Sequence, residues 1–112
     1  MVDAAVGGKT GINFNGLKNE IGVINPAESV IIYSDFLRSL DTENLLSGYA
    51  EMLKHGLLSS EEEMKKLSKF DARNPDFDLL AKLIETSIEV KANIVKQDPT
   101  EKGSRKALNL GH

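Results

Sequence analysis

The chain has 112 residues, 40% hydrophobic and 28% charged, and a formal net charge of −3, which suits one folded globular domain and argues against disorder. The negative charge also argues against a nucleic-acid partner, because binding to phosphates needs a clustered basic excess. Cysteine is absent, which excludes disulfides and thiolate metal sites. A long apolar run and a signal-peptide pattern are absent too, so we expect a cytoplasmic protein with no membrane partner.

Glycine dominates the first 22 residues, which hold five of the nine glycines and are therefore expected to form loops. Residues 3–13 invite comparison with a phosphate-binding loop, but the Walker pattern requires glycine where Asp3 stands. Consecutive glycines would still let backbone N–H groups approach an anion, and Lys9 would add a positive charge. Lys18 and Asn19 form a second cation and amide pair nearby. The alternative is a flexible loop with two surface lysines.

The segment 29–35 is short and rich in β-branched residues, which predicts a buried strand. A single strand cannot form a sheet, so we expect it to pair with something outside this chain. The pattern then becomes helical. The first expected helix begins at Asp41 or Thr42 and ends near Leu58, and the second begins at Ser59 or Ser60. The third runs from Pro75 to about Gln97, and a short fourth helix follows Gly103.

Charged residues on the two longer predicted helices are candidate site residues. Glu51 and Lys54 lie opposite the apolar stripe of the first helix, either as a solvent-exposed ion pair or as a metal-binding carboxylate beside an anion-binding lysine. Lys91 falls inside the apolar arc of the third helix, beside Ser87. A lysine there is unfavourable unless it meets a partner or an anionic ligand, and the alternative is a side chain that extends to solvent near the helix end.

The C-terminal segment carries a cation, an amide and an imidazole at helical spacing. Arg105, Asn109 and His112 stand at i, i+4 and i+7, so a helix would place them on one face. Such a set suits an anionic ligand and a metal ion. The alternative is a solvated polar stripe.

Taken in order, these motifs resemble those of the 3-dehydroquinate synthase family of sugar phosphate cyclases. Each motif is weak alone, but the combination is specific and spans nearly the whole chain. One departure is Asp3-Ala-Ala, where the family usually has Asp-Ser-Ser. The resemblance covers the middle of the family's sequence and stops at the first His of its Asn-Leu-Gly-His-x-x-Gly-His signature. The matching segments are residues 3–13, 18–22, 34–40, 46–54, 91–98 and 105–112.

The resemblance implies an enzyme of the shikimate pathway, which leads to aromatic amino acids. Members of the family convert 3-deoxy-D-arabino-heptulosonate 7-phosphate into 3-dehydroquinate. They use NAD to oxidise a ring hydroxyl transiently, release phosphate, reduce the ketone again and close a carbocycle. A divalent cation, usually zinc but in some cases Co²⁺, holds the reacting hydroxyls.

The resemblance also implies a role for individual residues. The expected metal ligands are Glu51 and His112, two of three. The expected catalytic residues are Lys91, Arg105, Asn109 and Glu101, the last as a proton acceptor. The expected substrate-binding residues are Asp3, Lys9, Asn19, Lys54, Lys91, Arg105 and Asn109. The expected NAD-binding residues are Lys9, Lys18, Phe36, Leu37, Arg38 and Ser39.

For the fold, the resemblance implies an α/β nucleotide-binding domain followed by an α-helical metal-binding domain, in a homodimer. We expect this chain to be mostly α-helical, with 1–40 as a glycine-rich loop and short strand from the NAD side and 41–112 as part of the helical domain. Because a third metal ligand and the second signature His are missing, we expect it to be inactive alone and to oligomerise through exposed apolar faces.

Three alternatives remain open. Other sugar phosphate cyclases, which make an inosose or a valiolone, share the chemistry and much of the motif set. Metal-dependent polyol dehydrogenases share the architecture but bind no phosphate, so the many cations argue against them. The third alternative is a non-catalytic helical interaction module.

Overall fold

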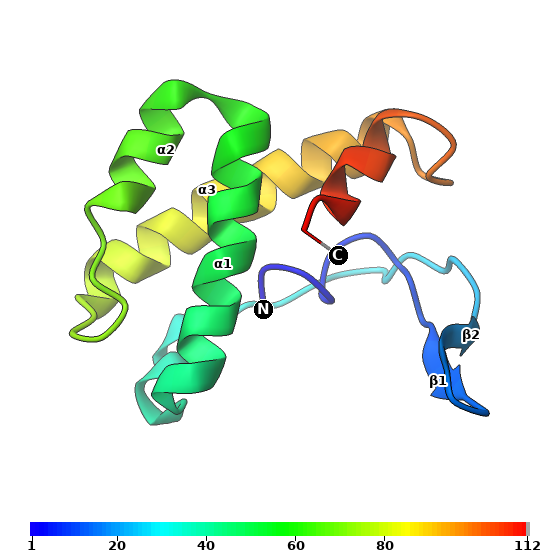
Figure 1. Ribbon diagram of the computed structural model, residues 1–112, viewed down its shortest axis with the longest axis horizontal. Coiled ribbons are helices and arrows are strands. Elements are labelled where there is room, and N and C mark those ends of the chain that lie inside the picture. Colours follow the sequence, from blue (N-terminus) through cyan, green and yellow to red (C-terminus); the bar gives the residue numbers. More distant parts are fainter. Residues whose placement is uncertain (112) are drawn as a thin grey trace.

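The computed structural model describes residues 1–111 as a set of packed helices with a β-hairpin beside them (Figure 1). The expectation of a mostly α-helical chain is confirmed. The elements in chain order are β1 (Ile12–Phe14), β2 (Leu17–Ile21), the 3-10 helix η1 (Ser34–Ser39), α1 (Thr42–Ser59), α2 (Glu61–Ser68), α3 (Phe77–Gln97) and the 3-10 helix η2 (Ser104–Asn109).

The three α-helices begin close to where the sequence predicts, because each has a polar residue that caps its first turn. The side chain of Asp41 accepts a hydrogen bond from the Asn44 N–H at the start of α1. Ser60 caps α2, and Asp76 caps α3 by accepting from two backbone N–H groups. Such caps satisfy N–H groups that have no partner within the helix.

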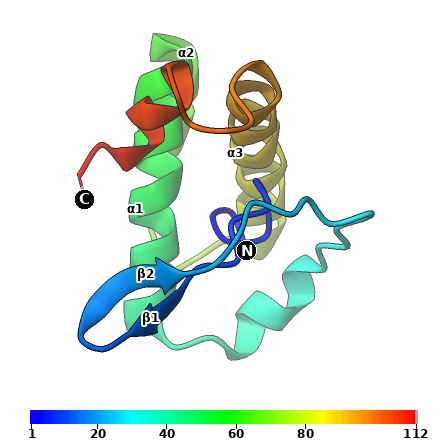
Figure 2. The same cartoon turned by 90° about the vertical axis from the view of Figure 1, so that its right-hand side faces the viewer.

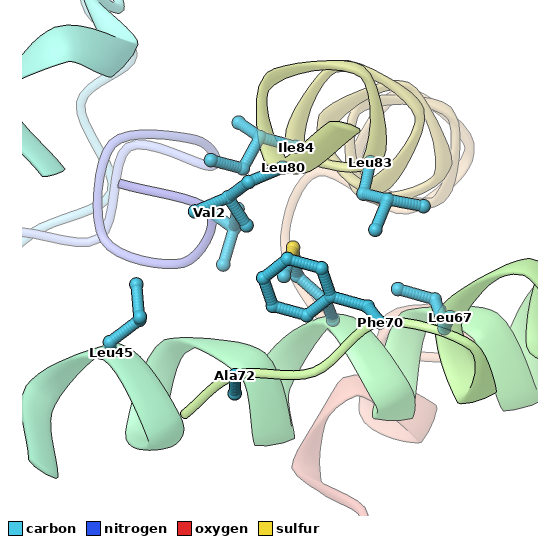
Figure 3. Close-up of a cluster of buried hydrophobic side chains, with 9 residues drawn as sticks. Val2, Leu45, Leu67, Phe70, Ala72, Leu80, Leu83 and Ile84 are labelled. Carbon is cyan, nitrogen blue, oxygen red and sulfur yellow. The ribbon is translucent and has the colours of Figure 1, made fainter. Parts of the chain in front are cut away.

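The hydrophobic core lies between α1 and α3 and is closed by side chains from the N-terminus and from the segment after α2 (Figure 3). Val2 lies between Leu45 of α1 and Ile84 of α3. This placement fixes the first residues of the chain against the helices and positions the loop that follows them. The buried apolar residues are Val2, Leu45, Met52, Leu67, Phe70, Ala72, Leu80, Leu83 and Ile84.

The predicted strand at 29–35 is wrong. Residues 29–33 have no regular structure, Ile31 is 92% exposed, and η1 begins at Ser34. The two strands of the described chain lie instead within the glycine-rich region that was expected to form loops. They pair with each other around Asn15 and Gly16, both of which have positive φ, as a tight hairpin turn requires. A strand needs a paired neighbour, and this turn supplies one locally.

Within residues 1–111, no helix combines the length and the apolar character needed to cross a membrane.

Candidate functional site

A cavity of about 610 Å³ lies between the N-terminal loop, the hairpin and the end of α3 with η2. Figure 2 shows the N-terminal loop close to α3, with the hairpin extending to one side. The cavity contains four cationic side chains and one carboxylate, which favours an anionic ligand. The candidate site residues that line it are Asp3, Lys9, Lys18, Asn19, Lys91, Arg105 and Asn109.

Lys91 joins α3 to the N-terminal loop. Its Nζ lies 2.5 Å from Oδ1 of Asp3 and also donates to the Asp3 carbonyl oxygen, and the residue is 6% exposed. The prediction of a buried lysine with a partner is therefore confirmed, and the solvent-reaching alternative is wrong. Burial acts to raise the pKa of Asp3, but the hydrogen bond from Lys91 and the charges of Lys91, Lys54 and His55 outweigh it, so the pKa is lowered.

Arg105 is buried and ties η2 to the glycine-rich loop. Its Nη1 donates to the Pro99 carbonyl at 2.6 Å, and its Nη2 donates to the Gly7 carbonyl at 2.8 Å. The Asp98 carboxylate accepts from the backbone N–H of Gly103 at 2.6 Å and of Arg105 at 3.1 Å. These bonds, that of Gly103 first, lower the pKa of Asp98. The guanidinium is thus fixed by two backbone carbonyl groups, and the Asp98 carboxylate holds the turn from which the Arg105 side chain extends.

Glu101 sits beside the cavity and connects two of its lining residues. It forms an ion pair with Lys9 and accepts a hydrogen bond from Nδ2 of Asn109 at 2.7 Å. These two contacts, Lys9 first, lower the pKa of Glu101, so its carboxylate is ionised at neutral pH. Glu101 also has a positive φ of 59°, which non-glycine residues rarely adopt.

The C-terminal motif does not form the expected α-helical face. The structure has a 3-10 helix that ends at Asn109, in which residues four apart do not stack. Arg105 is buried and Asn109 is exposed, yet both line the cavity, as does Leu108. His112, the predicted metal ligand, lies outside the described residues.

Glu51 and Lys54 of α1 form an ion pair away from the cavity lining. Nζ of Lys54 lies 2.5 Å from Oε2 of Glu51, and Lys54 is 7% exposed. The alternative of a solvent-exposed pair is therefore wrong, because Lys54 is buried and lies close enough to Asp3 of the N-terminal loop for its charge to lower the pKa of that residue. No group of three His, Cys, Asp or Glu side chains within residues 1–111 has the arrangement of a metal site. Glu51 remains a candidate ligand that needs partners from elsewhere.

The predicted NAD-binding residues are divided between two places. Lys9 and Lys18 line the cavity, but residues 36–39 lie in η1, which packs near the start of α3. Arg38 is held 4.9 Å from the centroid of the Phe77 ring. Phe77 and Lys91 are 14 residues apart on α3, so about 21 Å of helix separates η1 from the cavity wall. The described residues do not assemble this set into one dinucleotide site.

His55 and Ser87 are buried polar residues that the sequence pattern left without a role. His55 is 1% exposed, and its Nδ1 lies 2.6 Å from Oγ of Ser87. One signal was available: His55 stands ten residues after Leu45 and three after Met52, so it continues the buried face of α1. The apolar lining residues Val6, Val23 and Ile24 were also missed, because nothing local marks them as neighbours of the cations.

Comparison with known proteins gives consistent matches along the chain. A family model described as 3-dehydroquinate synthase C-terminal matches residues 48–112, and one described as 3-dehydroquinate synthase N-terminal matches residues 1–47. The chain is 58% identical over 111 residues to the 3-dehydroquinate synthase of Parabacteroides distasonis, covering 99% of this chain and 31% of that protein. It is 43% identical to the enzymes of that name from Bacillus pumilus and Staphylococcus epidermidis, covering 98% of this chain and 31% and 32% of theirs. The chain thus spans about a third of the length of these relatives.

Proposed function

Because this chain belongs to the 3-dehydroquinate synthase family, we propose that it forms the anion-binding part of an enzyme that converts 3-deoxy-D-arabino-heptulosonate 7-phosphate into 3-dehydroquinate. The observation that carries the proposal is the cavity between the N-terminal loop and α3, with four cations and one carboxylate in its wall. The substrate carries a phosphate and a carboxylate, and both match that charge.

The cavity provides two kinds of cation. Lys91 and Arg105 are buried and fixed by protein partners, so they offer positive charge at defined positions. Lys9 and Lys18 are exposed and can follow a ligand as it enters. Asn19 and Asn109 add amide groups for substrate hydroxyls. Charges that are already fixed need little rearrangement to stabilise the negative charge that develops on the phosphate as it leaves, and this favours its departure.

Glu101 is our candidate proton acceptor. A carboxylate whose pKa is lowered is ionised at neutral pH and can accept a proton from a group placed beside it. Its contacts with Lys9 and Asn109 keep it at the edge of the cavity. Bound sugar phosphate would compete for both partners and leave the carboxylate free to act.

The family generally uses NAD and a divalent metal. We propose that Glu51 contributes one ligand to zinc, or to another ion such as Co²⁺, and that His112 contributes a second. Residues 1–111 alone do not fit a complete metal site or a complete NAD site, since Glu51 is paired with Lys54 and η1 lies far from Lys9. Bound NAD would supply the oxidation and reduction of the ring hydroxyl, and a bound metal ion would hold the reacting hydroxyls.

The remaining features of the proposal follow from the family resemblance. We propose that residues 1–40 belong to the NAD side of the enzyme and residues 41–112 to its helical domain. We propose that the enzyme is a cytoplasmic homodimer and takes a small sugar phosphate as substrate.

The test is phosphate release from the heptulosonate phosphate by the intact protein in the presence of NAD and zinc. We expect release by the intact protein and none by residues 1–112 alone, which span about a third of the relatives' length. Lys91→Met in the intact protein should abolish release, and Lys82→Met, on the opposite face of α3, should not. Release from a different sugar phosphate would favour an inosose or valiolone synthase, and no phosphate binding at all would favour an interaction module.

A further inference from the structure

A row of buried polar side chains crosses from α1 to α3 beside the cavity. Lys54 is 7% exposed, His55 1%, Ser87 4% and Lys91 6%. Buried polar groups are unfavourable unless they are hydrogen-bonded, and four at one level of a small helical core are unusual. Two of them belong to ion pairs, Lys54 with Glu51 and Lys91 with Asp3. The other two, His55 and Ser87, bind each other.

The His55–Ser87 hydrogen bond lies one helical turn from Glu51 on α1 and one helical turn from Lys91 on α3. His55 follows Lys54 directly and stands four residues after Glu51 on α1, and Ser87 stands four residues before Lys91 on α3. Residues four apart are neighbours on a helix surface. The bond therefore joins α1 to α3 next to Lys54 on one helix and one turn from Lys91 on the other.

We propose that His55, through its hydrogen bond to Ser87, is a positioning residue that sets the placement of the Glu51–Lys54 pair relative to the Lys91–Asp3 pair. The first pair holds the candidate metal ligand, and the second lines the cavity. A change in how α1 meets α3 at this level would move one pair with respect to the other. The proposal rests on the proposed function for its kinetic test.

The charges around His55 agree with this role. Burial lowers its pKa, and the nearby cations Lys91 and Lys54 lower it further, while Glu51 and Asp3 act in the opposite direction. The imidazole is thus neutral at physiological pH. A third positive charge between two lysines would push them apart, and a neutral ring can hold the helices together without disturbing either ion pair.

The geometry also distinguishes His55 from ordinary core packing. Nδ1 is 2.6 Å from Ser87 Oγ, and Nε2 is buried without a hydrogen-bond partner within residues 1–111. An apolar residue would fill the same space with no unpaired nitrogen. What histidine provides and an apolar residue does not is the hydrogen bond between Nδ1 and Ser87, and the shorter amide side chain of asparagine can partly replace it.

The test uses four variants of the intact protein: His55→Leu, His55→Asn, Ser87→Ala and Leu45→Ala. His55→Leu and Ser87→Ala should lower kcat for phosphate release by about 10- to 100-fold with KM changed much less, since displacement of about 1 Å has effects of that size. His55→Asn keeps a hydrogen-bonding group and should recover most of kcat. Leu45→Ala, a cavity in the same helix core, should lower the thermal midpoint without changing kcat per folded molecule.

Two kinetic results would overturn the proposal. If the folded His55→Leu variant had the same kcat as the wild-type protein, His55 would be a packing residue only. A His55→Asn variant as slow as His55→Leu, with one limb of the pH profile lost, would mean that His55 itself exchanges protons.

Failure of the proposed function is recognised separately, because the wild-type protein would then release no phosphate. In that case calorimetric binding of inorganic phosphate carries the test. Weaker binding in His55→Leu and Ser87→Ala with recovery in His55→Asn supports the positioning role, and equal affinities in all variants overturn it.

Discussion

Nζ of Lys91 lies 2.5 Å from Oδ1 of Asp3, although 88 residues separate the two along the chain. The lysine is buried in α3, whereas the Asp3 side chain is 56% exposed. One charge of the pair thus belongs to the helical core and the other to the cavity wall. The contact attaches the N-terminal loop to α3 and partly neutralises Lys91 before any ligand arrives.

Asp3→Ala should destabilise the protein by about 1–2 kcal/mol, because a buried ammonium loses its charged partner and keeps the Asp3 carbonyl alone. Urea unfolding followed by circular dichroism measures the change. Glu85→Ala, at an exposed position of α3, serves as control and should stay within about 0.5 kcal/mol of the parent. Equal stability of Asp3→Ala and the control would mean that solvent screens the pair completely.

The same pair predicts a pH dependence. The pKa of Asp3 is lower in the folded protein than in the unfolded chain, so its contribution is present above the unfolded value near 4 and is lost as pH falls through the folded pKa. Unfolding free energies measured from pH 7 down to pH 3 should fall less steeply for Asp3→Ala than for the parent. Asp98 and Glu101 have lowered pKa values in both proteins, so the difference between the curves isolates Asp3.

Glu101→Gln should bind inorganic phosphate about three- to tenfold more tightly, because the change removes a negative charge that is paired with Lys9 beside the cavity. Phosphate release from the substrate should fall in the same variant, since glutamine cannot accept the proton. Isothermal titration calorimetry gives the affinity, with Glu85→Gln as the control of equal charge change. Weaker binding in Glu101→Gln would instead show that Glu101 holds Lys9 and Asn109 in their binding positions.

Gly7→Ala should destabilise the protein by at least about 2 kcal/mol. Gly7 has a φ of 113°, and a Cβ there would stand 2.5 Å from Nη2 of Arg105, so both the backbone and the guanidinium would have to shift. Phosphate affinity should fall with stability, because Arg105 lines the cavity.

Gly48→Ala is the matched comparison, and it should stabilise the protein by about 0.5–1 kcal/mol. Gly48 lies inside α1, and a Cβ there meets no atom within 4 Å, so only the helix propensity changes. Thermal unfolding of both variants beside the parent measures the two effects. Destabilisation by Gly48→Ala would contradict the open space found around this glycine.

The helices could be predicted from the sequence because their signals are local. Asp41 and Asp76 each precede an apolar pattern of helical period, and Ser60 precedes three glutamates that suit the first turn of a helix. Each of the three residues caps the helix that follows. Segment 29–35 misled for the opposite reason: its β-branched residues favour a strand, but a strand also needs a partner. The Asn15-Gly16 pair, a strong hairpin signal, was overlooked among the many glycines.

The candidate site was predicted residue by residue but not as an arrangement. Spacing on α3 placed Lys91 inside the apolar arc, where it either meets a partner or a ligand or extends to solvent, and no local pattern identified Asp3 as its partner. Lys54 was placed on the solvent side of α1 because helical periodicity identifies only the most apolar face of a helix and does not show whether another part of the chain covers the opposite face. Its burial depends on α3 and the N-terminal loop, which approach from elsewhere in the sequence.

Val2 in the helical core and the bond from Arg105 to the Gly7 carbonyl, across 98 residues, also determine the order in which the molecule assembles. α1 packs against both α2 and α3, and these contacts close shorter loops than the contacts of Val2 and Gly7 do, so they form earlier. The N-terminal loop can dock only after most of the chain is in place. The cavity should therefore be the last feature to appear during refolding and the first to open, and amide protons of residues 2–8 should exchange faster than those in the middle of α3.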